Sequence, residues 1–183
     1  MKKVIMLSSA LLLSISLAGC GSSSSDKSSE NTNQAKTEQK ESASKKDEVY
    51  SKVFNVGEEA NVNGVKVKVN NIRYSNGDDV ETPDQGKKYM ILNVTITNDS
   101  DKTIDYNELD FKFNVNGNSK DPDTVTLDGV NDLGSGSLDK NASLTKDLVG
   151  QVPVDENGQK IQLTYQPNSL DDNKLVHFNL NQQ

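Results

Sequence analysis

Apolar and polar residues alternate one by one along most of the chain after residue 50, and this pattern constrains the fold more than any other feature. A period of two residues is typical of a strand with one buried face, because successive side chains point to opposite sides of a sheet. No stretch of this region shows the period of about 3.6 residues that marks an amphipathic helix. The pattern predicts strands over residues 65–72, 88–97, 109–115, 144–154, 161–165 and 176–180.

Asn-Gly dipeptides separate several of these runs and predict tight turns, because both residues tolerate positive φ. They occur at residues 63–64, 76–77, 116–117 and 157–158. About seven to nine short strands joined in this way predict an all-β fold, an antiparallel β-sandwich over residues 49–183. This region has no cysteine and no tryptophan, so its core must be aliphatic, with phenylalanine and tyrosine.

Two details of the alternation carry further expectations. Ile72 breaks the parity set by residues 65–69, which predicts a β-bulge near Asn70–Asn71. In the run at 88–97, the main apolar stripe is expected on one face, and Tyr89 and Ile91 partly cover the other.

The first residues have the layout of a secretory signal. Residues 1–3 are positively charged, residues 4–18 are apolar apart from small serines, and no acidic residue precedes Asp26. The apolar run is shorter than the roughly 20 residues that a membrane-spanning helix needs. Residues 1–19 are therefore predicted to be an export signal.

The signal ends in Leu17-Ala18-Gly19-Cys20, which resembles the lipobox of bacterial lipoproteins at all four positions. Small side chains at 18 and 19 let a peptidase reach the Gly19–Cys20 bond, and the Cys20 thiol is placed to take a diacylglycerol. The alternative is an ordinary signal peptide that happens to contain a cysteine, but Cys20 is the only cysteine of the chain. The resemblance implies a lipid anchor on the outer face of the cell membrane.

Residues 20–48 are predicted to be the lipidated cysteine and a disordered tether. Eight of the 28 residues from 21 to 48 are serine, and six acidic residues nearly balance five basic ones. Such a stretch cannot bury enough apolar surface to offset the entropy lost on ordering. A weak helix over residues 34–46 is the alternative, but it would have no apolar face.

The charge of the mature chain limits its partners. Removing Lys2 and Lys3 with the signal leaves 18 basic against 27 acidic residues, a formal charge of −9. An acidic balance of this size argues against binding nucleic acid or lying on anionic lipid. We expect a monomer that contacts the membrane only through the lipid on Cys20.

Catalytic residues are not expected. A nucleophilic triad needs a base beside its serine or cysteine, and the single histidine, His177, alternates with Val176 and Phe178, so it should point away from the core. No zinc-protease, nucleophile-elbow or phosphate-loop motif occurs in the sequence.

One loop is a weak candidate for structural calcium. Asp78, Asp79, Glu81 and Asp84 lie together within residues 76–86, and extracellular calcium sites are built from such loop carboxylates. The spacing is not that of an EF-hand, and acidic clusters arise easily by composition in this chain. No other cofactor is expected.

Four segments resemble a known family of extracellular domains. They resemble the telokin-like, immunoprotective-extracellular Ig-like domain of unknown function found in lipoproteins of Gram-positive bacteria. The likeness spans residues 53–181 and implies an Ig-like sandwich, a surface location and no catalytic motif. Residues 132–138 depart from it, because the Gly-rich loop expected there lacks proline. The matching segments are Phe54–Glu58 with the strand after it, Gly86–Ser100, Gly150–Pro153 and Ile161–Pro167.

These features favour a non-enzymatic surface module that binds a protein or cell-envelope partner. The alternatives are an envelope hydrolase that uses loop carboxylates, and a surface defence lipoprotein that excludes phage by occupancy. Five tyrosines could supply a binding face, although Tyr89 and Tyr165 are expected to pack against strands. The five are Tyr50, Tyr74, Tyr89, Tyr106 and Tyr165.

Replacing the lipobox cysteine tests the anchor. Cys20→Ala should remove the lipid acceptor, so the protein should leave the membrane fraction while its circular dichroism spectrum stays that of the wild type. Cell fractionation and immunoblotting measure the distribution. Continued retention in the membrane pellet would mean that the anchor lies elsewhere.

Overall fold

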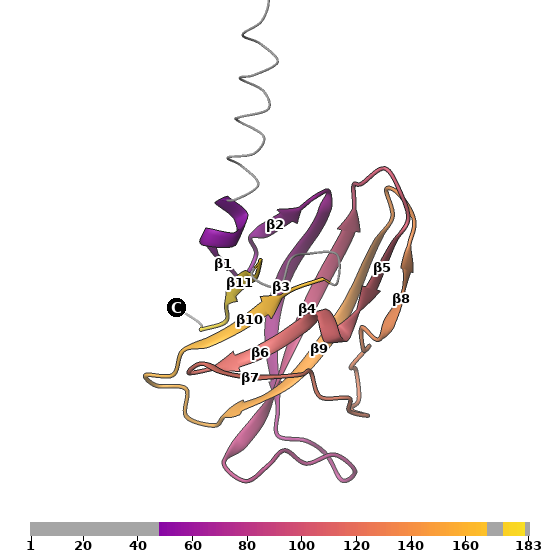
Figure 1. The fold of residues 1–183 in the computed structure, drawn as a ribbon. Coiled ribbons are helices and arrows are strands. Elements are labelled where there is room, and N and C mark those ends of the chain that lie inside the picture. Colours follow the sequence, from indigo (N-terminus) through magenta and orange to yellow (C-terminus); the bar gives the residue numbers. More distant parts are fainter. Residues whose placement is uncertain (1–47, 168–173, 182–183) are drawn as a thin grey trace, which may run out of the picture.

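Two β-sheets packed face to face make up most of the molecule (Figure 1). The computed structural model describes residues 48–167 and 174–181. The predictions for the export signal at 1–19, the Gly19–Cys20 cleavage and lipidation site, and the tether up to residue 47 lie outside the described residues. Residues 48–51 are helical, and Val49 and Tyr50 pack against the core of the sandwich.

The first sheet has five strands, and its edges are β1 and β7. All neighbours pair antiparallel except β1, which runs parallel to β11. In spatial order the strands are β1 (Val53–Asn55), β11 (Val176–Asn179), β10 (Ile161–Tyr165), β6 (Phe111–Val115) and β7 (Asn118–Lys120).

The second sheet is antiparallel and contains the three longest strands. Its order is β2 (Glu59–Val62), β3 (Val65–Ser75), β4 (Lys87–Asn98) and β9 (Ser143–Pro153). The pairing of β3 with β4 shifts register between Val69 and Asn71, which confirms the predicted bulge. The shift returns Ile72 to the core side of the strand.

A two-stranded ribbon forms one flank of the sandwich. β5 (Ile104–Asn107) pairs antiparallel with β8 (Ser135–Leu138), on the right of Figure 1. β8 lies within residues 132–138, where the sequence predicted a loop. Gly136 lies opposite Tyr106 in this pairing. β8 could not be predicted, because a strand with so few apolar residues shows almost no alternation of apolar and polar residues.

The core between the sheets is aliphatic and aromatic, as predicted. From the first sheet it includes Phe111 and Phe178, whose side chains are 0% exposed. Most of the core residues of the second sheet lie within residues 67–69 and 90–96. The predicted all-β sandwich is thus confirmed. The described residues form eleven strands rather than seven to nine, because several strands of three or four residues are too short to show a period.

One predicted strand start is wrong. Leu109 was expected to begin an alternating run, but Glu108–Asp110 forms a 3-10 turn and leaves Leu109 53% exposed. The side chain of Asn107 caps this turn by accepting a hydrogen bond from the backbone N–H of Leu109, at 2.9 Å. β6 therefore begins at Phe111, and Asp110 is buried in place of Leu109.

A second apolar cluster covers the outer face of the second sheet. Tyr89 and Ile91 of β4 and Val149 of β9 pack there against Val125 and Leu127. The latter two belong to a covering segment, residues 123–133, which runs along β9. Tyr89 and Ile91 thus lie on the second face of β4, as predicted, and the segment that packs on them was not predicted.

A buried carboxylate holds the covering segment in place. Asp147 of β9 accepts hydrogen bonds from Arg73 at 2.7 Å, from Asn93 at 3.0 Å and from the backbone N–H of Asn131 at 2.9 Å. Arg73 also donates to the backbone carbonyl of Gly129, at 2.8 Å. Since Asp147 is only 5% exposed, these donors satisfy a charge that would otherwise be costly to bury.

No helix within the described ranges is both long and apolar enough to cross a membrane.

The packing of the two sheets depends on a glycine. An ideal Cβ placed on Gly150 of β9 would lie 2.5 Å from a ring carbon of Phe113 on the opposite sheet. Because that ring is buried, it has little room to move. Gly150→Ala should lower the free energy of unfolding by about 1–3 kcal/mol, measured by urea titration followed by circular dichroism.

Asn118→Ala, on the exposed edge strand β7, is the control and should change stability by less than about 0.5 kcal/mol. If Gly150→Ala unfolded at the same urea midpoint as the wild type, the close approach of the Phe113 ring to Gly150 would be contradicted.

Candidate functional site

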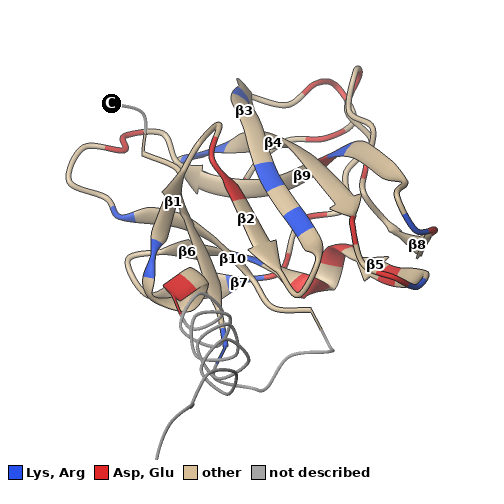
Figure 2. Cartoon of the chain, turned by 90° about the horizontal axis from the view of Figure 1, so that it is seen from above, with Lys and Arg blue, Asp and Glu red and all other residues tan. Residues whose placement is uncertain are grey.

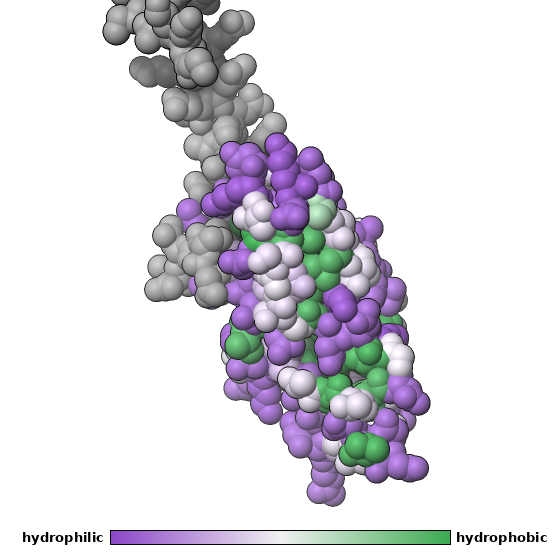
Figure 3. All heavy atoms as spheres, turned by 90° about the vertical axis from the view of Figure 1, so that its right-hand side faces the viewer, coloured by the Kyte–Doolittle hydropathy of each residue, from purple (hydrophilic) through white to green (hydrophobic). Residues whose placement is uncertain are grey.

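A groove of about 820 Å³ lies between the β5–β8 ribbon and one end of the sandwich. We call it the ribbon groove. Its walls come from the turn between β2 and β3, from Ser100, from residues 102–107, from Asp110, from residues 135–137 of β8, and from Tyr165 and Pro167. On the flank that carries the ribbon, apolar and weakly polar residues form a strip bordered by hydrophilic ones (Figure 3).

A buried asparagine positions the ribbon. Asn98 ends β4 with an exposure of 0%, and its side-chain amide donates to the carbonyls of Leu138 at 2.9 Å and Lys102 at 2.8 Å. Its oxygen accepts from the backbone N–H of Ser100, at 3.0 Å. The end of β8 and the segment just before β5 are thereby attached to the end of the second sheet.

Tyr106 of β5 forms part of the groove wall because its neighbour on β8 has no side chain. An ideal Cβ on Gly136 would lie 2.7 Å from the Tyr106 hydroxyl, so the tyrosine ring occupies the space that a larger residue would fill. Tyr106 is half-buried and packs against the main core. Its position therefore depends on a Gly–Tyr pair across the ribbon.

Tyr165, at the end of β10, is the second tyrosine of the groove. It stacks on Phe111 with ring centroids 4.7 Å apart and is 5% exposed, as expected for a tyrosine that packs on a strand. Burial raises the pKa of its phenol, and the negative charge of Asp110 raises it further. The phenol is therefore protonated at neutral pH and keeps its hydrogen-bond donor.

Polar groups at the groove are held by their neighbours. The hydroxyl of Ser137 donates to Asp105 at 2.7 Å, and the hydroxyl of Thr103 donates to Asp139 at 2.9 Å. Lys102 is exposed. The groove thus combines apolar walls and two tyrosines with fixed polar groups, as ligand sites commonly do.

The single histidine does not belong to this groove. His177 lies on β11 between the buried Val176 and Phe178, and it points away from the core as predicted. Its Nδ1 lies 3.4 Å from the Thr164 hydroxyl, and partial burial lowers its pKa. Among the residues that line the groove there is no cysteine or histidine that could form a nucleophile–base pair.

The predicted calcium loop uses its carboxylates separately. Asp78 accepts from the backbone N–H groups of Val80 and Glu81, both at 2.8 Å, and these bonds lower its pKa. The Asp84 carboxylate pairs with Lys87 at 2.6 Å, which lowers the Asp84 pKa.

Glu81 itself accepts from the backbone N–H of Thr126 in the covering segment, at 3.1 Å. Asp79 is exposed. In the part of the chain that the structure describes, no three acidic, histidine or cysteine side chains come together as a metal site. Calcium binding by Asp78, Asp79, Glu81 and Asp84 stays a prediction.

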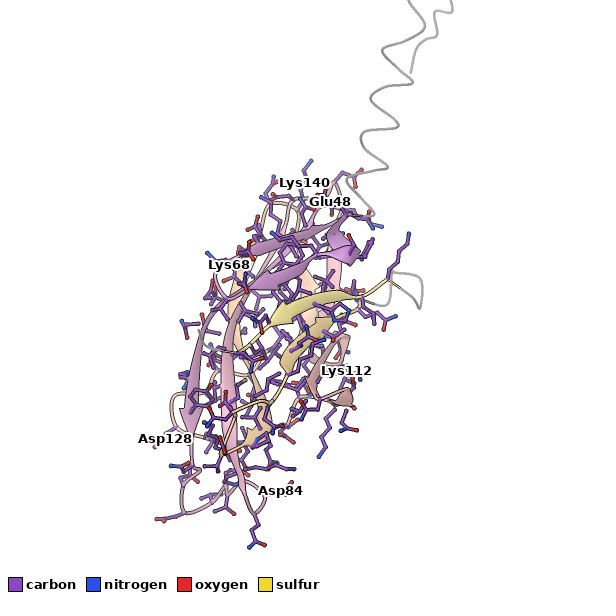
Figure 4. The ribbon with its side chains drawn as sticks, turned by 90° about the vertical axis from the view of Figure 1, so that its left-hand side faces the viewer. Glu48, Lys68, Asp84, Lys112, Asp128 and Lys140 are labelled. Atoms are coloured by element: carbon purple, nitrogen blue, oxygen red, sulfur yellow. The ribbon has the colours of Figure 1, made fainter. Side chains whose placement is uncertain are left out.

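The calcium loop lies at the far end of the molecule from residue 48. In Figure 4, Asp84 and Asp128 lie at one end of the sandwich, whereas Glu48 and Lys140 lie at the other. The ribbon groove, which begins at the β2–β3 turn, is thus a separate site on the flank of the domain.

Positive charges on the second sheet have acidic neighbours. Figure 2 shows two basic positions on β3 beside an acidic position on β2. Lys66 lies 2.6 Å from Asp99 and 3.6 Å from Glu59, and the hydrogen bond with Asp99 is the main cause of its raised pKa. These pairs balance charge locally on an exposed surface.

Sequence reasoning found only part of this site. Tyr106 and Tyr165 were among the five candidate tyrosines, but no pattern singled them out from Tyr50 and Tyr74. Asn98 was missed, although a polar residue at the end of a long apolar run is a usable signal of a buried structural amide.

Two crystal structures from Bacillus subtilis resemble the chain. The ycdA protein, described as a candidate lipoprotein, has 19% identity and a TM-score of 0.57, over 67% of this chain and 38% of that one. The yjhA protein has 20% identity and a TM-score of 0.52, over 70% of this chain and all (100%) of that one. At such identities the likeness concerns the fold.

The chain therefore spans well under half of the ycdA structure and the whole of the yjhA structure. No curated protein matches the sequence. A family model, DUF4352, described as a domain of unknown function, matches residues 54–175. Because the match covers more than half of the chain, the protein belongs to the DUF4352 family.

Proposed function

We propose that the protein is a lipid-anchored module on the outer face of the cell membrane, and that its domain binds a protein or cell-envelope partner without catalysis. The ribbon groove is the observation that carries this proposal. It presents the half-buried Tyr106 beside the largely buried Tyr165, together with fixed polar groups, on an open flank of the sandwich.

The size and lining of the groove support binding. A volume of about 820 Å³ lies within the range of roughly 300–1,000 Å³ that is usual for ligand sites. Tyrosine gives a large contact area at a small entropy cost, because it has few rotatable bonds. The walls are held by the Asn98 amide and the core, so little ordering would be needed when a partner binds.

The chemistry of the described side chains supports a non-catalytic role. His177 lies outside the groove, and Asp78, Glu81 and Asp84 accept hydrogen bonds from three different parts of the chain. A hydrolase would need two carboxylates that face one another in a cleft. The groove lining does include two carboxylates, of which Asp105 accepts a hydrogen bond from the Ser137 hydroxyl and Asp110 is buried.

The location rests on the lipobox at Cys20 and on the resemblance to domains of bacterial surface lipoproteins. The similar ycdA protein, described as a candidate lipoprotein, supports this location. A module displayed in this way could also exclude phage by occupying a surface receptor, which would be a special case of partner binding.

The strand order supports the finer Ig-like assignment. An Ig sandwich places strands A, B and E in one sheet and strands C, F and G in the other. β3, β4 and β9 are neighbours in the second sheet, and β6, β10 and β11 are neighbours in the first, which matches those two sets in chain order. We include an Ig-like topology in the proposal on this basis.

Replacing a groove tyrosine tests the proposal in the full-length protein. Tyr106→Ala should reduce the yield of the partner cross-linked in intact envelopes by about tenfold or more, because an aromatic anchor is lost. Tyr74→Ala is the matched control, since Tyr74 is also partly exposed, at 37%, but lies outside the groove. Quantitative mass spectrometry of the cross-linked products measures the yield.

Gly136→Ala is a second variant that keeps both tyrosines. The new methyl group would displace the tip of the Tyr106 ring, so it should alter the groove and weaken capture while costing less stability than Gly150→Ala. Equal cross-linking by the wild type, Tyr106→Ala and Gly136→Ala would rule out the groove as the binding site.

A further inference from the structure

A second cavity, of about 560 Å³, opens on another side of the sandwich, where β1 and β11 face β3. We call it the amide cavity, because asparagines make up most of its lining. It shares no lining residue with the ribbon groove. Its lining residues are Asn55, Val56, Asn70, Asn71, Ile72, Asn179 and Asn181.

The cavity exists because the second sheet loses an edge strand at the bulge. β2 pairs with β3 only over Val65–Lys68, so β3 has no partner on that side from Asn70 onward. β1, at the edge of the first sheet, lies across the opening. The backbone N–H of Gly57 donates to the carbonyl of Val69 at 2.8 Å, which links the turn after β1 to β3 just before the bulge.

Several of the amides are held in fixed orientations. Asn181 donates to the carbonyl of Gln159 at 2.9 Å and accepts from the backbone N–H of Ile161 at 3.1 Å. Asn70 donates to Asn93 at 3.0 Å. Such bonds fix the directions in which the remaining donors and acceptors of the cavity point.

Asn71 is available to a ligand. It is exposed, and within the described residues its side chain makes no hydrogen bond. Its amide offers two N–H donors and one carbonyl acceptor. The cavity thus contains a free amide among oriented ones, beside the apolar Val56 and Ile72.

The uncharged, amide-rich lining of the cavity favours a neutral ligand that carries hydroxyl groups. No charged residue lines the cavity, so nothing there would offset the cost of removing an ion from water. Amides pair best with groups that both donate and accept, and hydroxyl groups do so. The C–H face of a sugar ring could at the same time cover Val56 and Ile72.

An added peptide strand fits this place less well. The backbone N–H of Asn55, on the edge strand β1, already donates to the Glu58 carboxylate at 2.6 Å. The edge of β3 is interrupted by the bulge at residues 69–71, and bulges hinder strand addition.

We propose that the amide cavity binds a neutral oligosaccharide through its asparagine side chains. This site is independent of the partner proposed for the ribbon groove, so either can fail without the other. Tyr106→Ala should leave saccharide binding unchanged, and Asn71→Ala should leave partner cross-linking unchanged.

The test is isothermal titration of the full chain with three oligomers. The N-acetylglucosamine tetramer and the glucose tetramer are neutral, and the galacturonate tetramer is anionic. We expect saturable binding of at least one neutral oligomer and none of the anionic one. Asn71→Ala should bind about tenfold more weakly, because its hydrogen bonds to the ligand are lost.

Asn118→Ala is the matched control, an exposed asparagine on β7 that lies outside the cavity. It should bind as the wild type does. Val56→Asp, which places a charge at the cavity wall, is a second variant and should also weaken binding. Binding of neither neutral oligomer by the wild type, or equal affinities of the wild type, Asn71→Ala and Val56→Asp, would overturn the proposal.

Discussion

The burial of β4 on both of its faces is the constraint on which the rest of the structure depends. Met90 and Leu92 point into the core between the sheets, whereas Tyr89 and Ile91 pack under the covering segment. A slip by one residue would also move Val94 and Ile96 from the core to the outer face, where Thr95 and Thr97 lie partly exposed. The register of β4 with both of its neighbours, β3 and β9, is therefore fixed.

The ribbon groove follows from the same strand. β4 ends at Asn98, whose buried amide contacts the chain on both sides of the ribbon, and β9 begins shortly after β8. The ribbon is thus joined to the pair of strands that is held most firmly. The wall formed by Tyr106 is positioned by this attachment and by Gly136 on the facing strand.

Alternation predicted the parts of the fold in which apolar residues decide the structure. The strands around residues 65–72 and 88–97 and the bulge at Asn70–Asn71 follow from burial alone. β8 could not be predicted in this way, because it depends on the pairing of Gly136 with Tyr106. The exposure of Leu109 could not be predicted either, because it follows from the turn that Asn107 caps. The two cavities also escaped prediction, since each is built from residues that approach one another only through the packing of separate strands.

The two ends of the sandwich differ in a way that bears on electrostatics. β4 has 12 residues, so at roughly 3.3 Å per residue it separates the Glu48 end from the Asp84 end by about 40 Å. The Debye length at physiological salt is about 8 Å. Carboxylates in the loop after β3 are therefore several screening lengths from anything charged at the Glu48 end. A charged surface at one end therefore has almost no electrostatic influence on ions or ligands that approach the other end.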